Sequence, residues 1–155
     1  MAKEQKRLGE LLIEKGLITQ DQLDVALDEQ KTTKEFLGGI LINRGSIEEK
    51  DLLQALSDQY DMPFVPLDNT YIDWDMVKGY SSSLISDHRC FPIKIDDISV
   101  TFAISNPLDT NAMEKAETEA RGLKIRFILV TKKDMDEVLE RHRRRMQEDI
   151  DKMFE

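Results

Sequence analysis

The sequence predicts an α+β protein with a helical N-terminal part and a small sheet in its C-terminal part. Two observations lead to this prediction: a helix-like motif that occurs twice in the first 60 residues, and a later order of strand, strand, helix, strand and helix. The 155 residues, 40% hydrophobic and 34% charged, suit one globular domain or two small subdomains. We expect a tandem-repeat helical subdomain at 1–62, a connector and helix at 63–89, an α/β sandwich of about three strands at 90–143, and a charged C-terminal helix or linker at 144–155.

Residues 7–30 and 36–59 are two copies of one motif. At a constant offset of 29 they are identical at ten positions: Leu8/Leu37, Gly9/Gly38, Leu12/Leu41, Ile13/Ile42, Gly16/Gly45, Ile18/Ile47, Leu23/Leu52, Ala26/Ala55, Leu27/Leu56 and Gln30/Gln59. This agreement indicates duplication. A duplicated unit also favours an approximate two-fold arrangement, which suits a ligand that is itself two-fold symmetric.

Each copy predicts two helices joined by a glycine turn. Apolar residues spaced i, i+3, i+4 begin each copy and form one helical face. Gly16 and Gly45 follow, and glycine ends helices because it adopts a left-handed conformation without a steric clash. The second helix of each copy has leucines four residues apart. We predict capping boxes at its start, from Thr19 with Gln22 in one copy and from Ser46 with Glu49 in the other.

Two repeated features are not explained by an apolar stripe alone. Gly9 and Gly38 are expected near the start of a helix, where glycine costs roughly 1 kcal/mol relative to alanine. Either a ligand approaches the backbone there, or another helix does. Gln30 and Gln59 end the two motifs and are expected to point away from the apolar stripe.

The remaining chain predicts the elements of a small α+β layer. Two prolines in 60–67 indicate an extended connector, and alternating apolar and polar residues around Asp96-Asp97 indicate a β-hairpin with a two-residue loop. Thr131 is the expected N-cap of a long charged helix. The expected elements are a helix at 75–84, strands at 91–95 and 98–104, a helix at 110–121 closed by Gly122, a strand at 125–130 and the final helix.

Charge and composition exclude several classes of function. The formal net charge of −9 argues against non-specific binding to DNA or to anionic lipid. No apolar stretch is long enough to insert into a membrane, and no signal peptide is visible. Cys90, the single cysteine, is expected to be a buried hydrophobe, which fits a cytoplasmic protein. The basic run 141–145, flanked by acidic residues, is typical of a solvated helix or linker.

Catalytic motifs are missing from the sequence. It contains no phosphate-binding loop of the G-x-x-x-x-G-K-[ST] type, no Cys/His spacing typical of a metal site and no credible Ser/His/Asp set. We therefore expect a non-enzyme without a metal or a cofactor.

The repeat resembles the MshEN-type domain, which is the N-terminal domain of type II secretion and type IV pilus assembly ATPases. The pattern that carries the resemblance is RLGxxLxxxGxxxxxxLxxxLxxQ, present twice with five residues between the copies. The first copy matches at every fixed position, whereas the second has Phe36 in place of the arginine. Similar segments in the second half extend the resemblance to roughly residues 5–143, including PFVPL, the strand hairpin and AISNPLD.

The resemblance implies that cyclic di-GMP is the ligand. Arg7 would pair with a phosphate or with a guanine edge, Gln30 and Gln59 would hydrogen-bond a base or phosphate, and leucines would cover the purine faces. Phe36 removes one charge, although its ring could stack on a base, so we expect an asymmetric site or a loss of affinity. The implied ligand-binding residues are Arg7, Leu8, Gly9, Leu12, Leu23, Leu27, Gln30, Phe36, Leu37, Gly38, Leu41, Leu52, Leu56 and Gln59.

Two functions remain open at this point. The first is a cyclic di-GMP sensor with a protein partner in a secretion, pilus or signalling system. The second is a ligand-free docking module that positions a secretion or pilus component. The first expects Arg7, Gly9 and Gln30 to be exposed in one groove. The second expects the glycines to be buried between helices and an apolar patch to be exposed elsewhere.

Overall fold

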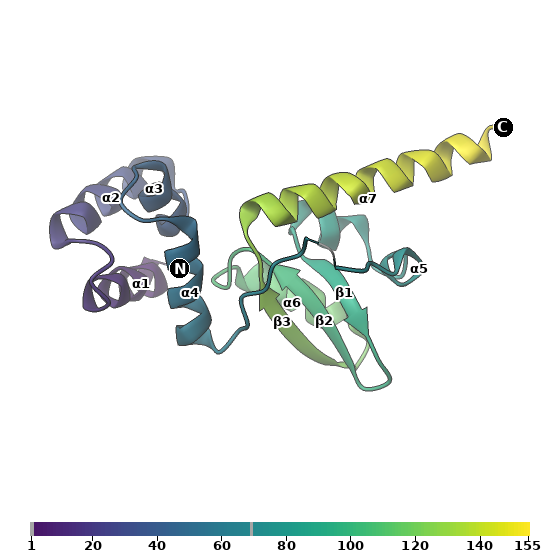
Figure 1. The fold of residues 1–155 in the computed structure, drawn as a ribbon, viewed down its shortest axis with the longest axis horizontal. Coiled ribbons are helices and arrows are strands. Elements are labelled where there is room, and N and C mark those ends of the chain that lie inside the picture. Colours follow the sequence, from purple (N-terminus) through teal and green to yellow (C-terminus); the bar gives the residue numbers. More distant parts are fainter. Residues whose placement is uncertain (1, 69) are drawn as a thin grey trace. The chain divides into compact units, whose positions relative to one another are not determined.

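The chain folds into two compact units, one that ends at Asp61 and one from Met62 to Glu155. The computed structural model describes residues 2–68 and 70–155, and in the first helix it describes side chains from Arg7 onward. The first unit is entirely helical and the second contains a three-stranded sheet with helices (Figure 1). This confirms the predicted α+β class. Among the described residues, no helix combines the length and apolar character that a membrane span needs.

The first unit consists of α1 (Ala2–Glu14), α2 (Gln20–Thr33), α3 (Leu37–Asn43) and α4 (Glu49–Tyr60). The two copies turn in the same way after their first helix. Gly16 and Gly45 have φ angles of +72° and +76°. In each copy, the amide that follows the glycine donates a 2.9 Å hydrogen bond to the carbonyl five residues earlier, as in a Schellman motif. The predicted glycine turns are therefore confirmed.

The starts of α2 and α4 occupy equivalent positions but are capped differently. The Thr19 hydroxyl accepts from the Gln22 amide, and the Gln22 side chain accepts from the Thr19 amide, which confirms the first capping box. The predicted box from Ser46 to Glu49 is wrong. The N-cap of α4 is Glu48, whose side chain makes no capping hydrogen bond. Thr19 and Glu48 lie 29 residues apart, so the duplication keeps the cap position although it changes the residue.

The helices of one copy pack against the helices of the other. The helix α2 packs against α3, and α1 packs against α4. Two ion pairs join the same helices: Lys15 Nζ lies 3.7 Å from Asp58 Oδ2, and Arg44 Nη2 lies 3.0 Å from Glu29 Oε1. Lys15 aligns with Arg44 and Glu29 aligns with Asp58 at the offset of 29. Exchange of the copies therefore converts one ion pair into the other, as expected of an approximate two-fold axis.

The second unit is built on three strands in the order β1-β2-β3: β1 (Phe91–Ile95), β2 (Ser99–Ile104) and β3 (Lys124–Leu129). The central strand β2 pairs antiparallel with β1, with an irregularity in register between Pro92 and Lys94, and parallel with β3. The helix α6 (Thr110–Glu119) provides the crossover that a parallel pair requires. The predicted strand, strand, helix, strand and helix order is confirmed.

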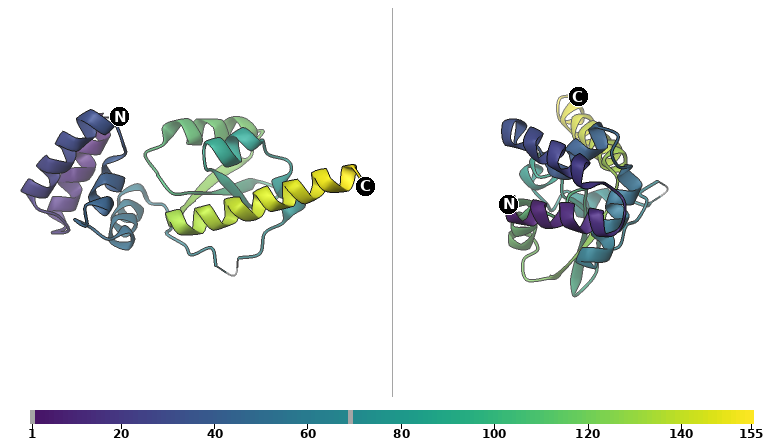
Figure 2. Two further views of the ribbon diagram at one scale, coloured as in Figure 1. Left: turned by 90° about the horizontal axis from the view of Figure 1, so that it is seen from above. Right: turned by 90° about the vertical axis from the view of Figure 1, so that its left-hand side faces the viewer.

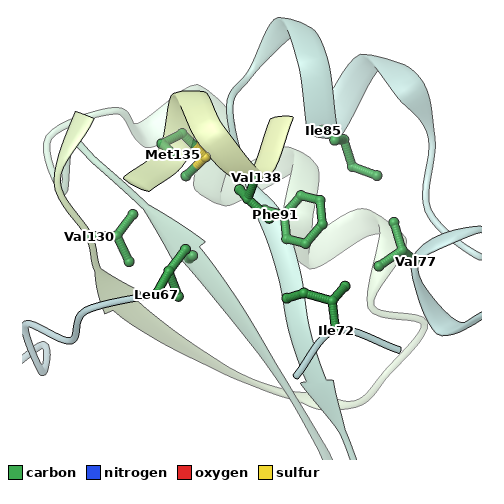
Figure 3. Close-up of a cluster of buried hydrophobic side chains, with 9 residues drawn as sticks. Leu67, Ile72, Val77, Ile85, Phe91, Val130, Met135 and Val138 are labelled. Atoms are coloured by element: carbon green, nitrogen blue, oxygen red, sulfur yellow. The ribbon is translucent and has the colours of Figure 1, made fainter. Parts of the chain in front are cut away.

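Helices cover both faces of this sheet, with α6 on one face and α7 (Lys132–Met153) on the other (Figure 2). Thr131 caps α7 as predicted, because its hydroxyl accepts from the Asp134 amide at 3.0 Å. Figure 3 shows the apolar cluster on the α7 side. It comprises Leu67, Ile72, Val77, Ile85, Phe91, Ala103, Val130, Met135 and Val138. Residues 144–153 continue α7 without a break.

The segment predicted as a helix at 75–84 is instead two short helical turns. The turn α5 spans Trp74–Val77, and a π-helical turn, η1, spans Ser83–Asp87. Between them, the Ser81 amide and hydroxyl donate to the Glu119 carboxylate at 2.7 and 2.5 Å. Burial opposes ionisation of Glu119, but these hydrogen bonds lower the pKa of its carboxyl overall. This contact with a distant helix replaces the local hydrogen bonds of a continuous helix.

The β-hairpin loop spans residues 96–98 and is one residue longer than the predicted two-residue loop. Ile95 pairs with Val100, and the Asp96 amide donates to the Ser99 carbonyl at 2.9 Å, so β2 begins at Ser99. The Asp96 carboxylate accepts from the amides of Ile98 and Ser99. These backbone hydrogen bonds lower the pKa of Asp96 and hold Ile98 in the turn.

Three rings pack together where α7 meets the start of β1. His142 stacks on Trp74 with ring centroids 6.4 Å apart, and Phe91 meets both rings edge-on. His142 is buried, and burial lowers its pKa because the charged imidazolium would lose water. Burial likewise raises the pKa of the Cys90 thiol to about 12, and this side chain is fully buried as predicted.

The buried His142 makes stability depend on pH. Its pKa in the folded protein lies below the ordinary value of 6.5, so near that pH the unfolded chain binds the proton more readily. We predict that the free energy of unfolding falls as the pH drops through about 6.5 and continues to fall toward the folded-state pKa. Urea unfolding at pH 8, 7, 6 and 5 measures this dependence. His142→Phe should flatten it, and His88→Asn, the control at the other histidine, should leave it. An equal slope in the wild-type protein and His142→Phe would refute the assignment.

Candidate functional site

The repeated glycines lie between helices. A Cβ on Gly9 would lie 2.4 Å from Cδ1 of Leu23, and a Cβ on Gly38 would lie 2.7 Å from Cδ2 of Leu52. Leu23 and Leu52 are equivalent positions of the repeat, so each copy contains the same glycine–leucine contact. The structure therefore supports the helix-contact interpretation of the glycines. It also shows that Gly9 lies within α1, which begins at Ala2, and not near a helix start as we expected.

Most of the predicted leucines form the interior of the helical unit. Of the eight leucines in the implied ligand site, Leu27 is half-buried and the other seven are 3% exposed or less: Leu8, Leu12, Leu23, Leu37, Leu41, Leu52 and Leu56. Their side chains pack the hairpins together. A ligand at the surface can reach their edges or the neighbouring backbone only where the helices open.

The predicted site residues with accessible side chains are few. Arg7 and Gln59 are exposed, and Gln30 and Phe36 are half-buried. Gln30 donates from Nε2 to the Glu35 carbonyl at 3.0 Å, next to Phe36. The structure thus brings together the end of the first copy and the start of the second. Phe36 is the N-cap of α3, and its ring closes over Gly38, where Cε1 would lie 2.7 Å from an added Cβ.

A groove of about 740 Å³ is lined by residues of α2 together with Arg44, and the predicted site residues are not part of its lining. Its lining comprises Asp24, Val25, Asp28, Glu29, Thr32, Thr33 and Arg44. Three carboxylates face a single guanidinium, and that guanidinium is bound to Glu29. This groove is unsuited to an anionic dinucleotide because it would repel the phosphates.

The charged residues that form ion pairs between the copies were not predicted from the sequence. Lys15, Glu29, Arg44 and Asp58 align as Lys/Arg and Glu/Asp pairs, which a count of identities ignores. Charge-preserving similarity at the offset of 29 is the signal that could have found them. They form ion pairs between the helix ends of the two copies.

Comparison with known protein families identifies the family of this chain. The family model for the MshEN domain matches residues 60–149, which is more than half of the chain. The chain belongs to the MshEN domain family. The match covers almost all of the sheet-containing unit, whereas the tandem motif that first suggested the family lies in the helical unit.

Relatives of this MshEN domain extend over both units. The chain is 29% identical over 136 residues to the type IV pilus assembly ATPase PilB of Myxococcus xanthus, and 27% identical over 139 residues to PilB of Thermus thermophilus. It is 26% identical over 123 residues to bacteriophage adsorption protein B of Escherichia coli. The aligned regions cover 88%, 88% and 79% of this chain but only 24%, 16% and 16% of those proteins.

Two solved structures have the same fold. A structure of MshE with cdg is 29% identical, has a TM-score of 0.79, and is matched over 86% of this chain and 96% of that chain. The N-terminal domain of XpsE is 20% identical with a TM-score of 0.69, over 88% of this chain and 93% of that one. The XpsE likeness supports the fold alone.

The glycine–leucine contact in α1 gives a prediction about stability, with a control glycine in α3, the equivalent helix of the second copy. Gly9→Ala should destabilise the protein by about 1–2 kcal/mol, because the new methyl group overlaps Leu23 in a packed core. Gly39→Ala should stabilise it by about 0.5–1 kcal/mol, because its Cβ meets nothing within 4 Å and alanine is the better helix former. Urea unfolding measures both. Equal effects of the two substitutions would contradict the close contact.

Proposed function

We propose that this MshEN domain is a cyclic di-GMP sensor that has no catalytic activity of its own and acts in the cytoplasm. The observation that carries the proposal is the likeness to MshE, whose structure contains cdg, cyclic di-GMP. That likeness extends over both units of the chain. The likeness to the two PilB pilus assembly ATPases supports the further proposal that its protein partner belongs to a pilus, secretion or signalling system.

The symmetry of the helical unit supports the same ligand. Cyclic di-GMP consists of two equal halves, and a site built from two equivalent hairpins can offer each half similar contacts. The equivalent ion pairs Lys15–Asp58 and Arg44–Glu29 hold the hairpins in such an arrangement. Gln30 and Phe36 lie next to each other at the junction of the two copies. Their equivalents at the offset of 29 are Gln59 and Arg7, so we expect Gln59 and Arg7 to lie at the corresponding place.

We assign the polar contacts of the ligand to two ends of one site. At one end Arg7 provides a guanidinium for a phosphate or a guanine edge, with Gln59 as a further donor. At the other end Gln30 lies beside Phe36, which offers a ring face to a base but no charge. Backbone near the glycines and the edges of the leucines complete the site. The two ends therefore bind the two halves of the ligand with unequal strength.

Burial of the glycines favours a second candidate function. If the repeated glycines serve only the Gly9–Leu23 and Gly38–Leu52 contacts, the unit needs no ligand and would act as a docking module. Exposed apolar side chains such as Val25 and Tyr60 would then contribute to a contact with a protein. The titration below separates the two functions.

Calorimetric titration of the purified protein with cyclic di-GMP tests the sensor function. We expect saturable binding, and we expect Arg7→Ala to weaken it about tenfold because a charge-assisted hydrogen bond is lost. Arg126→Ala removes an exposed arginine outside the repeat and should leave the affinity unchanged. GTP and ATP should bind far more weakly. Absence of heat at several hundred micromolar ligand would exclude the sensor function and favour docking.

The departure at Phe36 gives an independent prediction. Phe36→Arg restores the arginine of the motif at the second copy, and we expect it to tighten cyclic di-GMP binding about tenfold. If the Phe36 ring instead stacks on a base, the same substitution weakens binding. The same titration measures both outcomes, and an unchanged affinity would place Phe36 outside the site.

A further inference from the structure

The helix α7 carries an apolar face that continues beyond its contacts with the sheet. Met135, Val138 and His142 are buried where α7 packs against the rest of the second unit. At the same spacing of three or four residues, the helix then presents apolar side chains to solvent. Leu139 is partly buried, and the exposed fractions that follow are 40% for Met146, 45% for Ile150 and 80% for Met153. We refer to these four residues as the C-terminal stripe.

Charges along the same part of α7 are ordered in blocks. Residues 143–145 are three arginines, and acidic residues follow at 148, 149 and 151. A second α7 in parallel orientation would set arginine against arginine and acid against acid. In antiparallel orientation, centred near residue 147, Arg143 lies opposite Asp151 and Arg145 lies opposite Asp149. The charge pattern is therefore complementary to itself when it is reversed.

We propose that the C-terminal stripe binds the same stripe of a second copy of this chain, with the two α7 helices antiparallel. The apolar side chains supply the attraction, and the charge blocks select the orientation. The contact is isologous, so it closes as a dimer. A stripe of four residues is much smaller than the interface of a permanent dimer, so the dimer dissociates on dilution.

The present partners of these charges permit such pairing. Arg143 bonds to Glu140 on its own helix at 2.9 and 2.6 Å, Asp149 lies 3.6 Å from Lys78, and the Arg145 guanidinium lies 5.0 Å from the Trp74 ring centroid. All three residues are exposed. Exposed ion pairs of this kind contribute little to stability, so exchange with a second copy is nearly neutral in energy.

Sedimentation velocity over a range of concentrations tests the proposal. We expect a reversible monomer–dimer equilibrium that weakens as salt rises. Ile150→Glu should raise the dissociation constant at least tenfold without changing thermal unfolding, because the side chain is already partly exposed. Monomer at all concentrations in the wild-type protein would overturn the proposal. A dimer unaffected by Ile150→Glu would equally overturn it, because a different surface would then mediate association.

A charge exchange tests the pairing of the charge blocks, because reversal of one block should weaken the dimer only if opposite charges face each other in the wild-type protein. The double variants R143E/R145E and D149R/D151R should each dimerise at least tenfold more weakly, because like charges then face each other. An equimolar mixture should regain association, since each acidic block again meets a basic one. K50E/K133E makes the same change in net charge as R143E/R145E, at exposed positions outside the stripe, and should dimerise normally. If the mixture stays monomeric, the helices do not pair in this orientation. Neither result depends on whether the helical unit binds cyclic di-GMP.

Discussion

The helical unit depends on the absence of two Cβ atoms. Gly9 and Gly38 let Leu23 and Leu52 approach the backbone of the preceding helix so closely that an added Cβ would overlap their methyl groups unless the leucines moved. Each contact closes its hairpin, and the closed hairpins bury the leucines that pack them together. The equivalent ion pairs at the helix ends add a second, weaker restraint on the same arrangement.

Periodic features were predictable from the sequence, and contacts between distant residues were not. The duplication, the glycine turns, the three strands and the Thr131 cap all leave a local pattern, and each was found. The helix expected at 75–84 is interrupted because Glu119, 38 residues after Ser81, binds its amide and hydroxyl. The loop of the β-hairpin is one residue longer than predicted because the carboxylate of Asp96 accepts hydrogen bonds from the amides of Ile98 and Ser99. Sequence patterns do not show which side chain will accept a hydrogen bond from a backbone amide outside a regular helix or strand.

The candidate site shows the same division. Sequence alone could identify the equivalent glycines but could not decide between a ligand and a neighbouring helix; the positions of Leu23 and Leu52 decide that question. The sequence could not distinguish leucines that pack the core from leucines near the surface, because each lies on the apolar face of its own helix. The frame of the site is close to two-fold symmetric, whereas its accessible residues are not, since Arg7 aligns with Phe36.

The exchanged packing of the repeat has a consequence for how the domain can change over time. Because α1 packs with α4 and α2 with α3, each copy covers the apolar face of the other. Loss of one copy would remove the helices that pack against the other and would expose its buried leucines. The two copies therefore form one folding unit. Within that pair, packing holds the buried leucines and glycines the same in both copies, whereas the half-buried position 36 differs, with Phe36 aligned to Arg7.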